Sequence, residues 1–594
     1  LDGDCEFDAV TVSSGDTLDI NGQRAEVSGI LTIADGGTMN TTNGGLLVCG
    51  SNLIASGAIE DIDGTPLNVI VSSGTGHRYN LGQTGGGGPW CENLLVNGNV
   101  THNTGNIGNP SSAHAPKNII VGNGTFTQSG GNTTLQDFTI ATGGTFPAGS
   151  QTVTCEGDFT ASGGLIGKSA LDFDGSDDFV DLDNNAGWQF GTDNFTLEAW
   201  FKVDGGSGNR TIIANGDAGQ SGGWLLYMQS ANNIAFYANA VKVANANDRN
   251  YEDSKWHHVA AVRDGNDYLL YIDGKLKDKS TQSAFNLTHN GKASIGVRDL
   301  SGSADAFFEG QIAMVRVFKG ASGGARAQSE IIADMFNNSA SLIDSTDLMA
   351  AYDFNEGNGA SLDNIQGNTN FDGTITSASW VGKGTFTGGS STLVMSGTSK
   401  KIFFLDNAEV KNLTCSGTIT LDGVGASGND LKVNGNINIA GSLASEENEK
   451  LFVQGGSITF AVGTAATSIA NLKNLIIANP TTVTLPALTT KQIQMESGGT
   501  ATAGGDLTLT TELLINSGGT FNANSKTITA KVVDMNGTGA FALGAGALVL
   551  NDNSGGFESQ STSVFTAGPG CTVGGDASGQ KVPFQSQNGF QIVG

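Results

Sequence analysis

Five aspartates gather within ten residues of this 594-residue chain, between positions 174 and 183. Carboxylate oxygens are hard ligands of the kind that Ca²⁺ prefers, so this stretch is the first candidate for a cation site. Its ligands would be Asp174, Asp178, Asp181 and Asp183. A loop whose acidic groups are merely solvated is the alternative interpretation.

A larger ligand would meet the chain at its loops, where the backbone of a rigid scaffold presents binding groups to solvent. Trp224 directly follows the glycine pair 222–223 and could offer its ring there. The candidate ligand-binding residues are therefore Trp224, Asp174, Asp177 and Asp178.

Catalytic patterns are missing from the sequence. It contains no P-loop, nucleophile elbow or HExxH motif. A retaining glycosidase needs two carboxylates about 5 Å apart, whereas Glu198 stands alone in its strand pattern. His257 and His258 are adjacent, so their side chains should point to opposite faces of a strand. We predict no enzymatic activity; a polysaccharide-degrading site assembled between subunits remains the alternative.

Six cysteines are spread over the chain without any CxxC spacing, which argues against a zinc site. Cys49, Cys155 and Cys415 each end an apolar run just before a glycine turn. We interpret them as small apolar residues that stack inside the fold, with disulfide bonding as the alternative.

Composition limits the fold and the partners. The chain has 88 Gly but only 9 Pro, with recurring Val, Ile, Leu and Thr, which indicates many short strands. The net charge of −28 argues against nucleic-acid binding. The alternative interpretation of this acidity is that it only maintains solubility. The sequence contains no run of 18 apolar residues, so we predict no membrane span. The chain starts at Leu1 without a signal-peptide pattern, as either a processed protein or part of a longer one.

Internal repeats are the strongest pattern. One phrase beginning Gly-Thr-Phe occurs at 144–154, 384–394 and 519–529. A second places alternating apolar residues between Asn or Asp and a turn, as at 93–98, 118–122, 137–140 and 412–417. One strand and turn cannot bury its own apolar face, but coils stacked about 4.8 Å apart can. We predict a parallel β-helix, or solenoid, with an array of antiparallel sandwiches as the alternative.

The repeats stop after Gly167 and resume at Gly384, and the composition changes between these points. Five of the six Trp and six of the seven Tyr lie in this interval. We therefore expect a self-contained domain at 168–382, inserted into a solenoid made of residues 1–167 and 383–594. Because both ends of the insert return to the same shaft, we expect it to be held out sideways from the solenoid.

The insert alternates like an antiparallel β-protein. Period-two strands are predicted at 195–203, 258–263 and 268–272, and one helix at 328–336 with Ser329 as its N-cap.

Several ordered motifs in the insert are similar to those of bacterial laminin-G-like, concanavalin-type domains. They are ALDFDG at 170–175, FTLEAW at 195–200, KWHHV at 255–259, LYIDGK at 270–275 and FEGQI at 308–312. The resemblance implies a two-sheet jelly roll in which Trp200 and Trp256 are core residues. It also implies a Ca²⁺ ion on rim carboxylates. Many relatives carry acidic residues where this chain has Ala313 and Met314, and this departure weakens the calcium inference.

The all-β architecture, a solenoid interrupted by a lectin-like sandwich, suggests three functions. The first is a virion structural protein, such as a bacteriophage tail fibre or spike, that displays the sandwich for adhesion to a host-surface glycan or protein. The second is a secreted or surface-anchored bacterial adhesin, and the third a polysaccharide-degrading tailspike enzyme. We expect a homo-oligomer, with a trimer as the first guess, or an assembly with other virion proteins. The location would be the virion surface or, alternatively, the cell surface.

Overall fold

The structure is a computed structural model in which most of the chain is described. The residues left out are 62, 78–90, 103–106, 108–115, 129, 207, 299–301, 321–322, 338–341, 343–346, 382–383, 388–389, 405–407, 424–429, 464–468, 480, 552–555, 561, 576–583 and 587–594. The chain forms two compact units, the first made of Leu1–Gly131, Phe138–Phe146 and Thr160–Thr385, and the second of Asn132–Asp137, Pro147–Phe159 and Phe386–Gly594. In the described part, no helix is long and apolar enough to cross a membrane.

Parallel strands build the solenoid of the first unit. Its longest row is β1 (Cys5–Phe7), β4 (Arg24–Val27), β7 (Leu46–Cys49), β10 (Leu67–Val71), β12 (Cys91–Asn97), β14 (Pro116–Gln128), β16 (Phe138–Ala141) and β19 (Phe159–Gly163). Shorter rows are β2 (Val10–Val12), β5 (Leu31–Ile33) and β8 (Leu53–Ala55), and β3 (Thr17–Asp19), β6 (Thr38–Asn40) and β9 (Ala58–Glu60). Beside β14 lie β11 (Gly74–His77), β13 (Val100–His102) and β17 (Gly144–Pro147).

The second unit continues the same parallel pattern. One row is β15 (Thr133–Leu135), β18 (Thr152–Cys155), β37 (Thr392–Met395), β40 (Asn412–Cys415), β43 (Ile437–Ile439), β46 (Ser457–Val462), β48 (Thr482–Leu485), β50 (Thr500–Ala503), β52 (Thr520–Asn522), β55 (Ala540–Gly544) and β58 (Val564–Ala567). Another is β39 (Ala408–Val410), β42 (Asp430–Val433), β45 (Lys450–Val453), β47 (Asn474–Ile477), β49 (Leu488–Met495), β51 (Leu507–Ile515), β53 (Thr527–Ala530), β56 (Ala547–Leu550) and β59 (Thr572–Gly575). The remaining strands are β36 (Thr385–Thr387), β38 (Lys400–Phe404), β41 (Thr418–Gly423), β44 (Ser442–Ser445), β54 (Val532–Met535), β57 (Phe557–Ser559) and β60 (Phe584–Ser586).

The solenoid resumes directly after the insert. Strand β18 precedes the sandwich in the chain and β37 follows it, yet the two pair in parallel, with Cys155 opposite Met395. Met395 in turn lies opposite Cys415 of β40. All three side chains are buried, so they form one inward ladder, and Cys49, Cys155 and Cys415 are free thiols. The prediction of a parallel β-helix with inward-stacking cysteines is confirmed.

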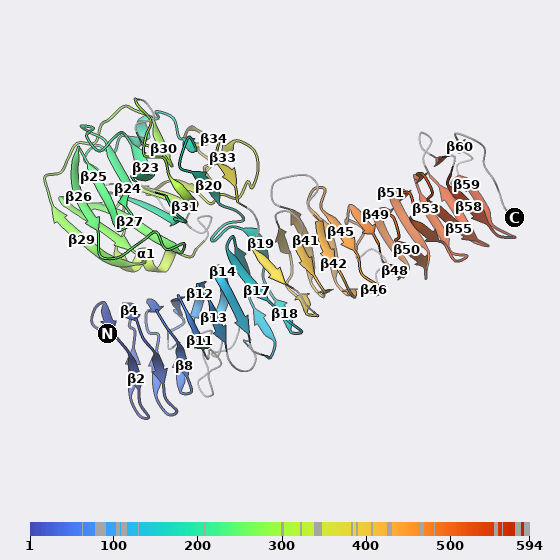
Figure 1. The fold of residues 1–594 in the computed structure, drawn as a ribbon, viewed down its shortest axis with the longest axis horizontal. Coiled ribbons are helices and arrows are strands. Elements are labelled where there is room, and N and C mark those ends of the chain that lie inside the picture. The colour runs from blue at the N-terminus through green and yellow to red at the C-terminus, as the bar shows by residue number, and fades with distance from the viewer. Residues whose placement is uncertain are drawn as a thin grey trace. The chain divides into compact units, whose positions relative to one another are not determined.

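The insert is an antiparallel sandwich of two sheets, drawn mostly in green in Figure 1. Sheet one contains β29 (Lys275–Thr281), β28 (Asp267–Ile272), β27 (Trp256–Asp264), β22 (Phe195–Lys202), β31 (Glu309–Lys319), β20 (Leu171–Asp174) and β35 (Ser379–Trp380), with β32 (Leu348–Tyr352) beside β31. Sheet two contains β26 (Val241–Ala246), β25 (Asn233–Ala238), β24 (Trp224–Ser230), β23 (Arg210–Asn215), β30 (Ala293–Ile295), β21 (Phe179–Asp181), β34 (Gly373–Thr376) and β33 (Ser361–Leu362). Short helices are η1 (Ala186–Trp188), α1 (Gln328–Asp334) and η3 (Thr369–Phe371).

Side-chain alternation decides which face of the sandwich is its core. In β22, Phe195, Leu197, Ala199 and Phe201 point into the cluster between the two sheets. Trp200 points the other way and packs on Met314, Met335 and Phe336 instead. This period-two pattern confirms the predicted strand and the two-sheet fold.

Helix α1 covers part of the outer face of sheet one. Its apolar residues Ile331 and Ile332 are buried, as the helical spacing predicted. The prediction that Ser329 is the N-cap is wrong, because the N-cap is Ala327, two residues earlier, and Ser329 lies within the first turn of the helix. The carboxylate of Glu330 accepts a hydrogen bond of 2.7 Å from the Ala327 amide and so satisfies a free helix-end donor.

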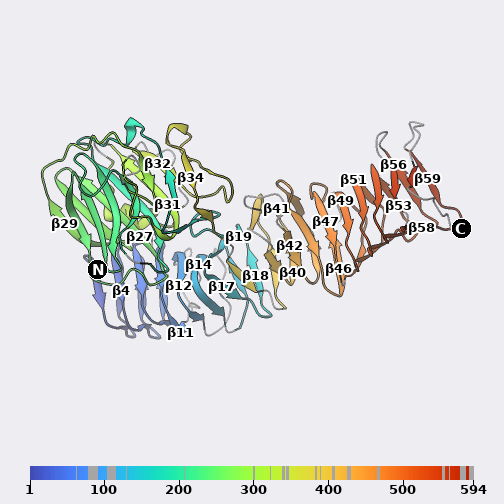
Figure 2. The same cartoon turned by 45° about the horizontal axis from the view of Figure 1, so that its top comes forward.

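The sandwich packs against the first solenoid, so the expectation that it is held out sideways is wrong. Figures 1 and 2 both show it beside strands β4, β12 and β14. One buried cluster joins the two parts, made of Leu46, Ile70, Leu95, Ile120 and Ala141 from the solenoid and Trp200, Trp256, Met314, Ile332 and Phe336 from the sandwich, among others. Burying each large apolar side chain contributes about 1.5–3 kcal/mol, enough to hold the two parts together.

Asparagines provide several of the polar contacts across this interface. The Asn97 side chain donates to the Trp256 carbonyl at 2.7 Å and accepts from the Trp256 amide at 3.0 Å. The Trp256 indole donates to the Gly122 carbonyl at 3.0 Å. Asn68 donates to the carbonyl of Ile332 at 3.1 Å. Backbone groups of the sandwich thus find partners on the solenoid, as buried peptide groups must.

Replacing Asn97 with Ala should loosen this interface, because both bonds to the buried Trp256 peptide group are lost. We expect about 2 kcal/mol of destabilisation, seen by scanning calorimetry as a fall of about 5 °C in the transition that contains the sandwich.

The matched control is Asn516→Ala. Asn516 is bonded to Glu496 and Asn536 within the second unit and takes no part in the interface. Equal effects of the two substitutions on the sandwich transition would contradict the role assigned to Asn97.

Candidate functional site

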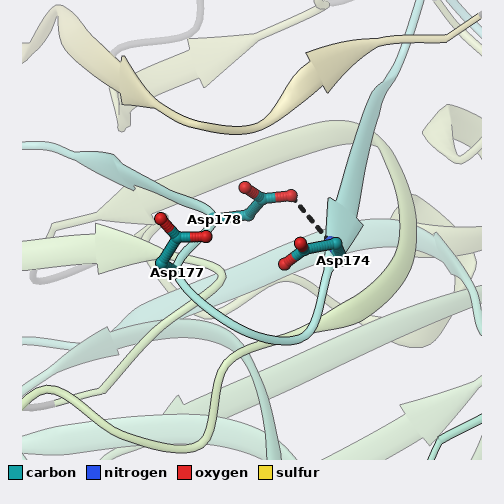
Figure 3. Close-up of side chains that lie close together, drawn as sticks. All are labelled: Asp174, Asp177 and Asp178. Carbon is teal, nitrogen blue, oxygen red and sulfur yellow. Dashed lines mark hydrogen bonds between the residues drawn. The ribbon is translucent and has the colours of Figure 1, made fainter.

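Three aspartates meet in the turn between β20 and β21. One carboxylate oxygen from each of Asp174, Asp177 and Asp178 lies within 4.8 Å of the others. Figure 3 shows the three side chains around this turn, with the Asp174 amide donating to Asp178 Oδ2 at 2.7 Å. The Asp174 carboxylate in turn accepts a bond of 2.8 Å from the Ser176 amide. Backbone donors therefore hold two of the carboxylates in place.

A residue that is distant in the sequence also contacts this turn. Ser377 follows β34, and its hydroxyl donates to Asp177 Oδ2 at 3.1 Å. In the sheet, Asp174 lies directly opposite Glu309 of β31, which brings another acidic residue to this edge. Sequence analysis missed both residues, since no local pattern links positions so far apart in the chain.

Negative charge at this turn favours a cation. Burial and the neighbouring charges of Asp174 and Asp177 raise the pKa of Asp178, although the hydrogen bond from the Asp174 amide opposes the shift. Asp178 is buried, while Asp174 and Asp177 are exposed to solvent. The three carboxylates repel one another, and a divalent cation that prefers oxygen ligands would reduce this repulsion. The donor set therefore fits Ca²⁺.

Two of the predicted metal ligands lie outside this cluster. Asp181 ends β21 and forms an ion pair with Lys292. Asp183 accepts a bond from the adjacent Asn184 amide and adopts a left-handed backbone conformation, with φ of 60°. The predicted set of Asp174, Asp178, Asp181 and Asp183 is thus divided, because β21 carries its last residues away from the turn.

Trp224 is not placed to bind a surface ligand. It is 1% exposed, stacks on Phe190 with ring centroids 4.8 Å apart, and donates its indole N–H to the Trp188 carbonyl. The glycines before it end a loop, but the tryptophan itself begins β24 and points into the core. We therefore leave Trp224 out of the candidate site.

The two adjacent histidines point to opposite sides of β27 and have different surroundings. His257 Nδ1 lies 2.9 Å from Asp273 Oδ2, and its Nε2 lies 3.1 Å from Asp253 Oδ1. Arg249 also contacts Asp273 Oδ2, at 2.7 Å. Burial alone would lower the pKa of His257, but the Asp273 charge and the bonds to both carboxylates hold it above its ordinary value.

His258 lies in a second buried group with Glu198 and Arg316. Glu198 Oε2 is 3.7 Å from Arg316 Nη1 and 3.9 Å from His258 Nε2. Burial raises the pKa of Glu198 to about 7, against the opposing effect of Arg316, and burial also lowers the pKa of His258 to about 3. Glu198 is 1% exposed, so it is not placed to touch a polysaccharide.

The fold of the insert matches a known family. Residues 174–328 match the family described as the concanavalin A-like lectin/glucanases superfamily, in its laminin-G form. The sandwich is therefore a concanavalin-like domain, and the predicted resemblance is confirmed. No curated protein matches the chain.

Several solved structures are similar to part of the chain at low identity. A putative carbohydrate binding protein from Bacteroides ovatus is 20% identical over 36% of this chain and 59% of its own, with a TM-score of 0.28. The CBM40 of Ruminococcus gnavus IT-sialidase, bound to α2,3 sialyllactose, is 18% identical over 27% of this chain and 95% of its own, with a TM-score of 0.24. Domains LG4-5 of the mouse laminin α1 chain are 16% identical over 26% and 41%, with a TM-score of 0.21. The chain thus spans about three fifths of the first of these proteins.

Replacing His257 with Gln should change how stability depends on pH. A histidine whose pKa is raised by folding stabilises the native state fully below its ordinary pKa, and this contribution is lost as pH rises through the raised value. We therefore expect the difference in free energy of unfolding between wild type and His257→Gln to be greatest at about pH 5.5 and to shrink toward about pH 8.5. Thermal unfolding of both proteins across this range measures it, and a difference that grows with pH would contradict the assignment.

Proposed function

We propose that this chain is a surface-displayed adhesin that binds glycans through its concanavalin-like sandwich. The observation that carries the proposal is the cluster of three carboxylates at the edge of a domain whose family is described as lectins and glucanases. The solenoid supports it, because a stack of coils is a stiff scaffold that presents an attached domain to the surroundings.

In this proposal Asp174, Asp177 and Asp178 hold a Ca²⁺ ion. Bound there, the ion supplies open coordination positions that hydroxyl oxygens of a sugar can occupy. The chain itself orients the site, since the Asp174 and Ser176 amides and the Ser377 hydroxyl each fix one carboxylate.

The proposed role is binding without hydrolysis. The one acidic residue of strand β22, Glu198, is buried beside Arg316 and takes no part in the carboxylate cluster. Incubating the protein with host polysaccharide should leave the polymer length unchanged. New reducing ends in that mixture would favour an enzyme instead.

We further propose display on a virion, as a tail fibre or spike, with further copies of this chain as partners. The support is the composition of the solenoid repeats, which are rich in Gly, Thr, Ser and Asn. Electron microscopy of phage particles and of bacterial cells, with an antibody against the sandwich, would locate the protein and show whether copies associate as trimers. Label on cell envelopes alone would favour the secreted or surface-anchored adhesin.

Replacing Asp177 with Asn should weaken Ca²⁺ binding without disturbing the fold, because Asp177 is exposed and holds only Ser377. We expect Ca²⁺ affinity to fall by at least about tenfold in calorimetric titration, since one of three charged ligands is lost. Binding to a glycan array should fall in parallel when Ca²⁺ is present.

Asp183→Asn is the matched control. This residue belongs to the same acidic stretch but lies outside the cluster, and Asn tolerates its left-handed backbone. A wild-type protein that gives no heat with Ca²⁺, or two variants with equal effects, would overturn the calcium site.

A further inference from the structure

A groove lies within the first unit, between helix α1 and four successive solenoid coils, those of β4, β7, β10 and β12. It encloses about 550 Å³. One wall contains Gln23, Asn43, Thr65 and Glu92, and the other contains Ser329 and Asn337. None of these residues belongs to the carboxylate cluster between β20 and β21.

Stacked Asn-Gly turns form the corner of the solenoid at this groove. Asn21 and Asn43 both adopt left-handed backbone conformations, and so do Gly22 and Gly44 that follow them. The Asn43 side-chain amide donates to Asn21 Oδ1 at 2.9 Å, one coil along. Because coils repeat about every 4.8 Å, the Asn21 and Asn43 side chains are spaced by roughly the length of one sugar unit.

The residues that line the groove indicate which class of ligand it can bind. Seven of its fourteen residues carry an amide or a hydroxyl, and both kinds of group donate as well as accept hydrogen bonds. Among the described residues that line it, there is no Lys or Arg that would bind an anion. Its carboxylate, Glu92, already pairs with Lys117 at 2.6 Å, so the groove offers little to a cation. These features favour a neutral ligand rich in hydroxyl groups.

A peptide strand fits this groove less well. Peptides commonly bind by adding a strand to an open sheet edge. Strands β4, β7, β10 and β12 lie beside the groove, where β7 pairs with β4 and β10, and β10 also pairs with β12. Their backbone groups are therefore engaged along the ladder, and side-chain amides remain the main polar groups for a ligand.

We propose that this groove binds a neutral oligosaccharide, extended along the solenoid with successive sugar units against successive coils. The site adds to the glycan-binding function proposed above, but it uses different residues and needs no cation. The two sites can therefore fail independently.

Ala333→Trp tests the proposal in the full chain. Ala333 is exposed on α1 and lines the groove, so a tryptophan there should fill the space without disturbing the core. The matched control is Ala333→Ser, which adds little volume. Circular dichroism and thermal unfolding verify that both variants fold like the wild type.

The probes are neutral gluco-, manno- and galacto-oligosaccharides of increasing length, titrated calorimetrically in the presence of a calcium chelator. We expect wild-type affinity to rise with length until the groove is filled, and Ala333→Trp to lower it by at least about tenfold. Gln23→Ala should lower it about tenfold through lost hydrogen bonds, while Asp177→Asn should leave it unchanged.

Three outcomes would overturn the groove site: no binding of any neutral oligosaccharide by the wild type, binding that Ala333→Trp leaves intact, or an extended peptide that binds in preference to sugars. If the wild type binds only when Ca²⁺ replaces the chelator, and Asp177→Asn alone loses that binding, the sugar lies at the carboxylate cluster instead. That result would sustain the proposed function while removing this second site.

Discussion

One row of solenoid strands is apolar on both faces, and the arrangement of the first unit depends on this. Leu47 and Val69 point inward, as any coil requires, while Leu46 and Ile70 point outward. A bare solenoid would leave this outer row in water. The sandwich covers it with Trp200, Trp256 and the apolar side of α1, so the hydrophobic effect positions the domain that carries the candidate sites.

The same packing separates structural charges from binding groups. Glu198, Arg316 and His258 lie buried on the side of sheet one that α1 and the solenoid cover, whereas His257 points to the opposite face of β27, near Asp273. The carboxylate cluster lies at a turn between the two sheets, where it reaches solvent. The polar groups that remain available to a ligand at the surface are therefore carboxylates and amides in turns.

The sequence predicted local features well and distant contacts poorly. Alternation identified β22, and repeated phrases identified the coils, because both patterns arise within a few residues. The surface covered by the sandwich has a local signal in the sequence: the runs LLVC at 46–49 and NLLVN at 93–97 contain consecutive apolar residues, unlike the alternating TVTC at 152–155. Continuous apolar strands are typical of sheets buried on both faces. Ser377 and Asp177 had no such signal, since only the folded sandwich brings them together.

Synthesis order gives the interface another consequence. The outward row from Leu46 to Ile120 leaves the ribosome before Trp200 and Trp256 exist, so the first coils emerge with an uncovered apolar stripe. At about 5–20 residues per second, that stripe waits many seconds for its cover. During this interval nascent chains can meet one another, or a chaperone, through the surface that the sandwich later occupies. The insert therefore acts like an intramolecular chaperone, because it is synthesised later and then covers the apolar row of the first coils.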